Sequence, residues 1–179
     1  MRDLVSSPLR LPGLCGLVVA LLVAAWPTSA MSLDDVYGGM ARGCTYDAAA
    51  NYRIITAYVD EHTEGPKLAR PEGGKQLAPF LGRASLILTE EFYTLEIPVS
   101  DATLYGIPVS KLAPYRGIGS GIAGVTITLP IPLSAVRSKL DSAGVKLVAD
   151  DHGWGEIEPV LQPVATDSAS TELVCDLSM

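Results

Sequence analysis

Residues 92–99 read FYTLEIPV, and their pattern indicates a half-buried β-strand. Tyr93, Leu95, Ile97 and Val99 recur at every second position, which places them on one face of an extended chain. A second stretch, VTITL at 125–129, is rich in β-branched residues and predicts a strand over 124–129. Together the two stretches predict that the later part of the chain forms a sheet.

Shorter segments extend this prediction. Apolar, β-prone runs predict further strands at 84–88, 145–149, 160–166 and 172–177. The tetrapeptide IPVS occurs at 97–100 and again at 107–110, which suggests two halves of a hairpin centred on Asp101 and Ala102. Proline cannot donate a backbone hydrogen bond, so both copies are expected at edge or terminal positions of strands.

Helices are expected mainly before residue 62. Ser32 is suited to cap a helix that ends at Gly43, with an apolar face at i, i+3, i+4 and i+7. The segment 47–61 is compatible with a helix or a strand, and its alanine-rich start favours a helix. A third helix is expected over 133–143, with Gly144 following it as the C-cap.

These elements predict an α+β fold with a largely antiparallel sheet and two or three short helices. We expect a single domain over residues 31–179, closed by one disulfide. Its parts are a helical segment at 31–61, a loop rich in Gly and Pro at 62–83, and a sheet-rich segment at 84–179.

The first thirty residues have the pattern of a secretory signal peptide. Arg2 and Arg10 precede an uncharged apolar run at 11–26, and small residues at 28–30 suit cleavage after Ala30. The run is too short for a membrane-spanning helix, which needs roughly 20 residues. Cys15 lies inside the run, after the bulky Leu14, which does not favour a lipid-anchor site. The sequence thus predicts a periplasmic or secreted protein without a stable membrane anchor after cleavage.

Charge and cysteine content constrain the partners and the covalent structure. The net charge is −7, and Lys and Arg are scattered singly, so nucleic acid is not an expected partner. Cys44 and Cys175 are the two cysteines that remain after cleavage, and in an oxidising compartment they are expected to form a disulfide. Neither cysteine has the neighbours of a catalytic thiol.

Residues 119–124, GSGIAG, match the spacing G-x-G-x-x-G of nucleotide-binding loops. A dinucleotide site needs a strand before this loop and a helix after it. Here the preceding segment KLAPYR is interrupted by Pro114, and the following segment is the predicted strand VTITL. We therefore expect a strand-connecting loop, no nucleotide site and no cofactor.

Hydrolase signatures are absent from the sequence. Ser120 is not flanked by the glycines of G-x-S-x-G, and neither S-x-x-K nor H-E-x-x-H occurs. A catalytic triad can be assembled from distant residues, so a small hydrolase that uses His62 or His152 stays an alternative. No catalytic residue and no metal ligand is assigned.

The stretch DDHGWGE at 150–156 is the one polar cluster of interest. Carboxylates beside a histidine can bind a metal or transfer protons, and a second stretch of this kind, DEHTE, lies at 60–64. The same composition also suits an exposed turn. Trp154 between two glycines favours an exposed binding surface, which we assign to Asp150, Asp151, His152, Trp154 and Glu156.

From these observations the expected function is binding. The interpretation we favour is a secreted or periplasmic accessory or inhibitor protein, similar in role to an immunity protein, with another protein as its partner. The alternatives are the small extracytoplasmic hydrolase and a carrier of a small apolar ligand, since small α+β folds can enclose a pocket.

Overall fold

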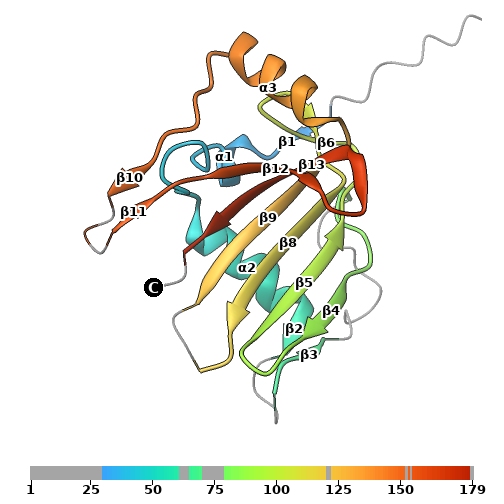
Figure 1. The fold of residues 1–179 in the computed structure, drawn as a ribbon. Coiled ribbons are helices and arrows are strands. Elements are labelled where there is room, and N and C mark those ends of the chain that lie inside the picture. Colours follow the sequence, from blue (N-terminus) through green and yellow to red (C-terminus); the bar gives the residue numbers. More distant parts are fainter. Residues whose placement is uncertain are drawn as a thin grey trace, which may run out of the picture.

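The computed structural model describes residues 30–60, 65–69, 79–119, 122–151, 153 and 155–177. The predicted signal peptide up to residue 29 lies outside the described residues, as do His62, His152 and Trp154. Three short helices accompany a predominantly antiparallel strand arrangement (Figure 1). The helices are α1 (Asp34–Tyr37), α2 (Ala48–Tyr58) and α3 (Leu133–Ser142).

The main sheet has six antiparallel strands in the order β12-β13-β9-β8-β5-β4. Their bounds are β4 (Ser85–Leu88), β5 (Phe92–Pro98), β8 (Lys111–Gly117), β9 (Ala123–Leu129), β12 (Val160–Val164) and β13 (Asp167–Asp176). Strands β4, β5, β8 and β9 are neighbours in chain order, whereas β13 inserts between β12 and β9. The predicted α+β class with a largely antiparallel sheet is therefore confirmed.

Seven shorter strands form small pairs beside this sheet. Strand β1 (Met31–Ser32) runs parallel to β6 (Ala102–Leu104), which pairs with β7 (Ile107–Pro108); β2 (Val59–Asp60) pairs with β3 (Lys67–Leu68); β10 (Asp150–Asp151) pairs with β11 (Glu156–Ile157). The short β1–β6 pair is the parallel exception within the described strands.

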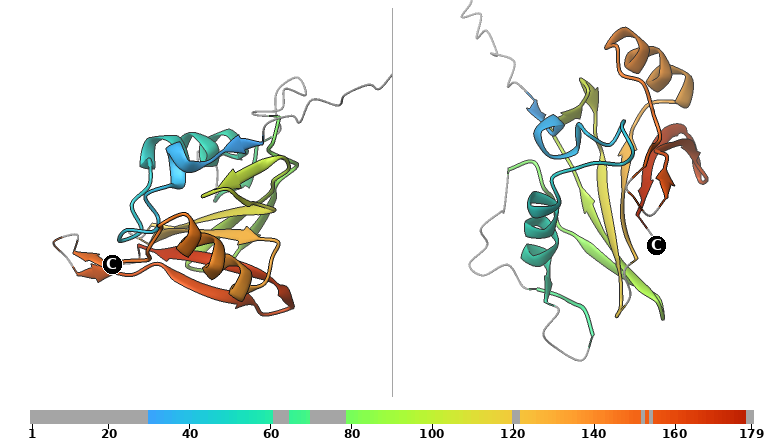
Figure 2. Two further views of the ribbon diagram at one scale, coloured as in Figure 1. Left: turned by 90° about the horizontal axis from the view of Figure 1, so that it is seen from above. Right: turned by 90° about the vertical axis from the view of Figure 1, so that its left-hand side faces the viewer.

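One face of the main sheet carries the core. The alternation predicted for 92–99 is confirmed, because Tyr93, Leu95 and Ile97 of β5 are buried. The same face continues through Ile127 of β9 and Leu173 of β13, which are paired in register. Helices α1 and α2 lie on this face (Figure 2), and α3 packs against β12 and β13.

The helix predictions hold with altered bounds. Helix α2 is capped by Asp47, whose side chain accepts a hydrogen bond from the backbone N–H of Ala50 at 2.9 Å. It ends at Tyr58, and Val59 and Asp60 form strand β2 instead, whereas residue 61 lies outside the described residues. The first helix is only one turn, Asp34–Tyr37, and Leu33 rather than Ser32 occupies its N-cap position.

Three strand predictions need correction. The hairpin near the repeated IPVS motif turns at Tyr105 and Gly106, not at Asp101 and Ala102, because both turn residues have positive φ (52° and 70°) as a tight hairpin requires. Pro114 does not interrupt its segment but lies inside β8. Its missing N–H explains the gap in the β5–β8 pairing between Thr94 and Ile97.

The predicted strand at 145–149 is also wrong. Only Val148 forms a β-bridge, parallel to Arg42. Val145 and Leu147 are partly buried against the core, whereas Lys146 and Val148 are exposed. The alternating pattern therefore reflects an extended segment with one face on the core, which does not require membership in a sheet.

Candidate functional site

Hairpin β10–β11 contains the described members of the predicted binding surface. Asp150 pairs with Ile157 and Asp151 with Glu156, and the hairpin projects from the rest of the fold (Figures 1 and 2). Asp150, Asp151 and Glu156 are all exposed. Asp151 accepts a hydrogen bond from the backbone N–H of Gly153 at 2.8 Å, which stabilises the turn. His152 and Trp154, the other two predicted members, lie outside the described residues.

The base of this hairpin is fixed to the loop that follows α1. The N–H of Gly43 donates to the carbonyl of Val148 at 2.7 Å, and the N–H of Val148 donates to the carbonyl of Ala41 at 2.8 Å. Gly43 has φ +55°, and a Cβ at this position would overlap the side chain of Asp150. A glycine is therefore required where the hairpin leaves the body.

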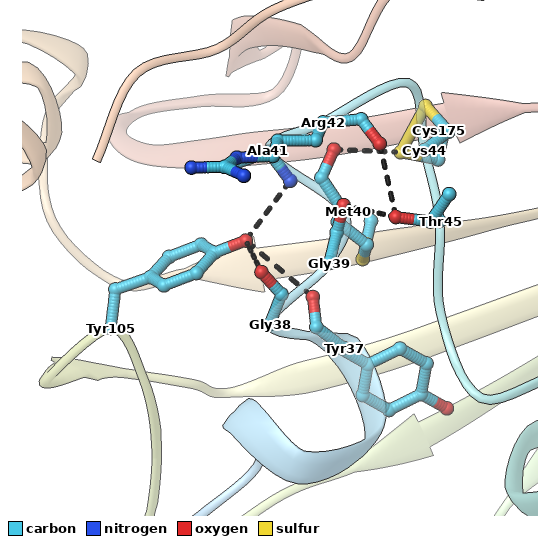
Figure 3. The surroundings of a disulfide bond; sticks show 10 residues. All are labelled: Tyr37, Gly38, Gly39, Met40, Ala41, Arg42, Cys44, Thr45, Tyr105 and Cys175. Atoms are coloured by element: carbon cyan, nitrogen blue, oxygen red, sulfur yellow. Dashed lines mark hydrogen bonds between the residues drawn. A yellow bond between two sulfur atoms is a disulfide. The ribbon is translucent and has the colours of Figure 1, made fainter. Parts of the chain in front are cut away.

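The same loop is held from behind by the predicted disulfide, which is confirmed. Cys44 and Cys175 are bonded, with their Cα atoms 5.2 Å apart and both residues buried (Figure 3). The bond joins the loop after α1 to strand β13, the second strand from one edge of the main sheet. Two segments separated by 131 residues are thus linked covalently beside the base of the hairpin.

Tyr105 supports the loop from the other side. Its hydroxyl accepts a hydrogen bond from the N–H of Ala41 at 3.0 Å and donates to the carbonyl of Gly38 at 3.0 Å. Burial raises the pKa of this hydroxyl above its ordinary value, so it stays protonated and able to donate. The loop 38–44 therefore has defined contacts on both sides.

A surface pocket of about 750 Å³ opens between this loop and the segment that leads to the hairpin. Its lining comes from the loop, from Tyr105 and from the segment after α3: Gly38, Gly39, Ala41, Arg42, Tyr105, Gly144, Val145, Lys146, Val148, Ala149 and Asp150. Arg42 and Lys146 are exposed. Figure 3 shows the Arg42 guanidinium extending away from the disulfide, on the side of Tyr105. The pocket thus combines two cationic residues with Asp150 at the hairpin base.

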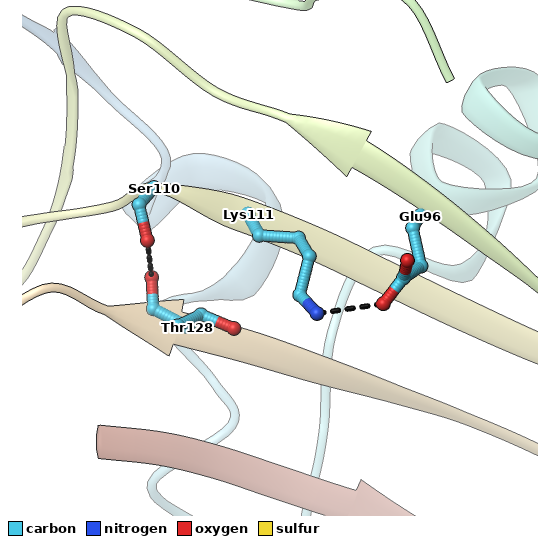
Figure 4. A network of polar contacts seen from close by, with 4 residues as sticks. All are labelled: Glu96, Ser110, Lys111 and Thr128. Atoms are coloured by element: carbon cyan, nitrogen blue, oxygen red, sulfur yellow. Dashed lines mark hydrogen bonds and ion pairs between the residues drawn. The ribbon is translucent and has the colours of Figure 1, made fainter. Parts of the chain in front are cut away.

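A second polar group lies on the sheet face opposite the helices (Figure 4). Lys111 and Glu96 form an ion pair at 2.6 Å, and Ser110 donates to the carbonyl of Thr128 at 3.3 Å. The Thr128 hydroxyl is buried without a hydrogen-bond partner in the structure. Because the ion pair is about one-third exposed, its net contribution to stability is small. None of these four residues lines the pocket between the loop and the hairpin base.

The glycine segment at 119–124 connects two neighbouring strands, as predicted. It leads from β8 to β9, and the N–H of Gly117 donates to the carbonyl of Ile122 at 2.7 Å at the base of this connection. Contrary to the expectation drawn from Pro114, a strand does precede it. A strand and not a helix follows it, so the segment lacks the helix N-terminus of a dinucleotide site.

The described residues contain no group of three or more His, Cys, Asp or Glu side chains placed to hold a metal ion. Across the same residues, none of the helices has the length and apolar character needed to cross a bilayer. The hydrolase alternative depends on His62 or His152, and both lie outside the described residues. Comparisons with family models, curated proteins and solved structures find no match to this chain.

Sequence reasoning identified the hairpin acids but not Arg42, Tyr105 or Lys146. These three residues come from segments far apart in the chain, which the bridge at Val148 and the hydrogen bonds of the Tyr105 hydroxyl hold together. One local signal was available: two glycines at 38–39 and a third at 43 mark a loop next to a cysteine, where the chain can adopt backbone conformations that other residues rarely allow.

Proposed function

We propose that this chain is an extracytoplasmic binding protein that recognises another protein through hairpin β10–β11. The observation that carries the proposal is that the hairpin projects from the body with its acidic side chains exposed. The Cys44–Cys175 disulfide fits a periplasmic or extracellular location, because such bonds persist in oxidising compartments.

The hairpin suits a partner with a basic surface. Asp151 and Glu156 face each other across the two strands, so their carboxylates lie close together and present concentrated negative charge. Opposite charges on a partner would accelerate association and make it dependent on salt concentration. The fixed base at Gly43 and Val148 reduces the conformational freedom that binding would remove.

The proposal is tested with charge-neutralised hairpin variants. The mature protein serves as bait for partners in periplasmic extract, and binding to each captured partner is then measured kinetically. Asp151→Asn with Glu156→Gln should lower the association rate constant about tenfold at low salt, and by less at high salt. Asparagine keeps a side-chain oxygen that can accept the bond from Gly153.

The matched control neutralises two exposed acids in another hairpin turn. Glu90→Gln with Glu91→Gln removes the same charge between β4 and β5, far from β10–β11 in Figure 1. This control should bind as the unaltered protein does. Equal effects of both double variants, or no effect of either, would refute recognition through the hairpin. Trp154→Ala, inside the same turn, is expected to weaken capture while leaving folding nearly intact.

The pocket favours a second function, the transport or capture of a small ligand. Its volume is within the range of small-molecule sites. Arg42 and Lys146 favour a ligand with an anionic group, in addition to the apolar part expected from sequence. Calorimetric titration with inorganic phosphate and with succinate should show saturable binding that Arg42→Gln abolishes and Asp151→Asn does not. Absence of saturation with both probes would leave the protein-binding proposal alone.

A further inference from the structure

Hairpin β10–β11 is connected to the rest of the fold through two arms that are held differently. The second arm continues directly into β12, which pairs with β13 in the main sheet (Figure 1). The first arm, residues 145–149, is extended, and within the described residues its β-pairing is the parallel bridge between Val148 and Arg42 of the loop 38–44. We call the contact of the first arm with this loop the junction. Because short two-stranded hairpins are marginally stable alone, the position of β10–β11 depends on the junction.

The junction is closed by contacts that are lost together when the arm moves away. The N–H groups of Gly43 and Val148 donate its two backbone hydrogen bonds, at 2.7 and 2.8 Å. The Asp150 side chain packs so closely against Gly43 that a Cβ at residue 43 would overlap it. Gly43 also has φ +55°, a conformation that other residues rarely adopt. The closed junction is therefore a defined arrangement, which a substitution at Gly43 would disrupt.

The pocket of about 750 Å³ lies across this junction. The loop and Tyr105 form one side of it, and residues 144–150 contribute the other side. Val148 lies opposite Arg42 in the bridge, and Lys146 is exposed on the same face of the arm as Val148. With paired chains about 4.8 Å apart and alternate residues about 6.6 Å apart, the Cα atoms of Arg42 and Lys146 are separated by about 8 Å. One small anion can therefore contact both side chains.

The two cations belong to opposite sides of the junction, Arg42 to the loop and Lys146 to the arm. Both are exposed, and neither forms an ion pair with a described residue. Two positive charges that face each other across the junction oppose its closure, although salt screens them at this distance. An anion that contacts both side chains favours closure instead, because it attracts groups on both sides of the junction. Such an anion would bind more tightly to the closed junction than to an open one.

We propose that the pocket is an effector site, in which a small anion bound by Arg42 and Lys146 holds the junction closed and thereby strengthens partner binding by the hairpin. This inference rests on the two functions proposed above and adds a coupling between them. An anion that orders the hairpin reduces the ordering that the partner must impose. Coupling between two sites is reciprocal, so the bound partner strengthens anion binding by the same factor.

Hydrogen exchange at the Gly43 and Val148 amides measures opening of the junction directly, because these two N–H groups donate the bonds of the bridge. The probes are inorganic phosphate and succinate, each at about one hundred times the dissociation constant measured by calorimetry. If the open junction does not hold the anion, exchange of both amides should slow by up to about 100-fold. The control is the amide of Gly117, which donates to Ile122 in the β8–β9 connection and should exchange at an unchanged rate.

A substitution at Gly43 tests the coupling without removing a residue that lines the pocket. Gly43→Ala would force the junction open, so the affinity for the anion should fall at least about tenfold. Gly106→Ala is the matched control, because Gly106 also has a positive φ of 70°, but a Cβ there meets no described atom within 4 Å. Circular dichroism and mass spectrometry verify that each variant is folded and keeps the disulfide.

The effect on the hairpin is measured with a partner captured by the mature protein. Succinate should lower the dissociation constant of that complex at least about fivefold, a gain that Arg42→Gln should remove. Saturable anion binding without slower exchange at Gly43 and Val148, an anion affinity insensitive to Gly43→Ala, or a partner affinity insensitive to succinate would each overturn the coupling. Failure of the anion site itself shows instead as no saturation with either probe. Failure of hairpin recognition shows as a partner affinity that the hairpin acids do not affect.

Discussion

Removing the Cys44–Cys175 disulfide is expected to be the most destabilising single covalent change to this fold. The bond closes a loop with a sequence separation of 131 residues. In the chain-entropy treatment, a loop of this length restricts the unfolded chain by about 5 kcal/mol, and measured losses for native disulfides are about 2–5 kcal/mol. Total stabilities of domains this size are about 5–15 kcal/mol. The double variant Cys44→Ala with Cys175→Ala should therefore lose about a third or more of its stability.

The assay is guanidinium unfolding followed by circular dichroism, comparing the oxidised protein, the same protein reduced, and the double alanine variant. Reduction alone keeps both sulfur atoms, so it isolates the effect of the cross-link from the loss of two buried side chains. The dependence of unfolding free energy on denaturant should also become steeper, because a chain without the cross-link unfolds to a more expanded state. A loss below about 1 kcal/mol on reduction, with an unchanged slope, would refute the reasoning.

Three further predictions concern buried groups. Tyr37→Phe should lower the free energy of unfolding by about 1–3 kcal/mol, because the Tyr37 hydroxyl donates to Oδ1 of buried Asn51 at 2.8 Å. The control Tyr52→Phe, at a half-exposed tyrosine, should lower it by less than about 0.5 kcal/mol. Equal losses in denaturant unfolding would contradict the burial argument. Burial raises the pKa of Tyr37 above the ordinary tyrosine value of about 10. Only the unfolded chain therefore releases this proton as the pH rises past about 10, so the free energy of unfolding should fall above that pH. An unchanged unfolding midpoint between about pH 9 and about pH 11 would exclude this pH dependence. Gly124→Ala should cost about 1–3 kcal/mol, because a Cβ there would overlap the Tyr115 ring and the Cys175 carbonyl, and a neutral result in thermal unfolding would mean that both can move aside.

Strong periodic patterns predicted the main sheet because burial on one face acts directly on residue choice. The alternation at Tyr93, Leu95 and Ile97 corresponds to three buried side chains on one face of β5. The same signal failed at 145–149, where Val145 and Leu147 contact the core without a neighbouring strand. An alternating apolar pattern indicates that one side of an extended chain is buried. Whether that chain also pairs in a sheet depends on which segments lie beside it in space.

The prediction that Pro114 interrupts its segment was wrong for a related reason. Proline is unfavourable inside a sheet only where its missing N–H would have donated to a neighbouring strand. In β8 the ladder to β5 is interrupted opposite this position, while β8 keeps its pairing with β9 from Lys111 to Arg116. Local sequence cannot show that the rest of the ladder compensates for one missing bond.

For the candidate site, sequence predicted the exposed acids and the disulfide but not the pocket. Asp150, Asp151 and Glu156 belong to a local turn whose residue types already favour exposure. Arg42 and Lys146 line the same pocket because a bridge between Arg42 and Val148 joins their two distant segments. Such a contact leaves no periodic pattern in either segment.

The position of β13 has a consequence for how the chain acquires its fold during synthesis. β13 follows every other strand of the main sheet in chain order, yet it lies between β12 and β9. Synthesis therefore completes this one interior strand last, and Cys44 lacks its partner Cys175 until that strand has emerged. Shortened chains that end before residue 167 would keep two unsatisfied sheet edges at β9 and β12. Premature termination should thus yield aggregation-prone fragments, whereas release of the complete strand allows the sheet and the disulfide to form together.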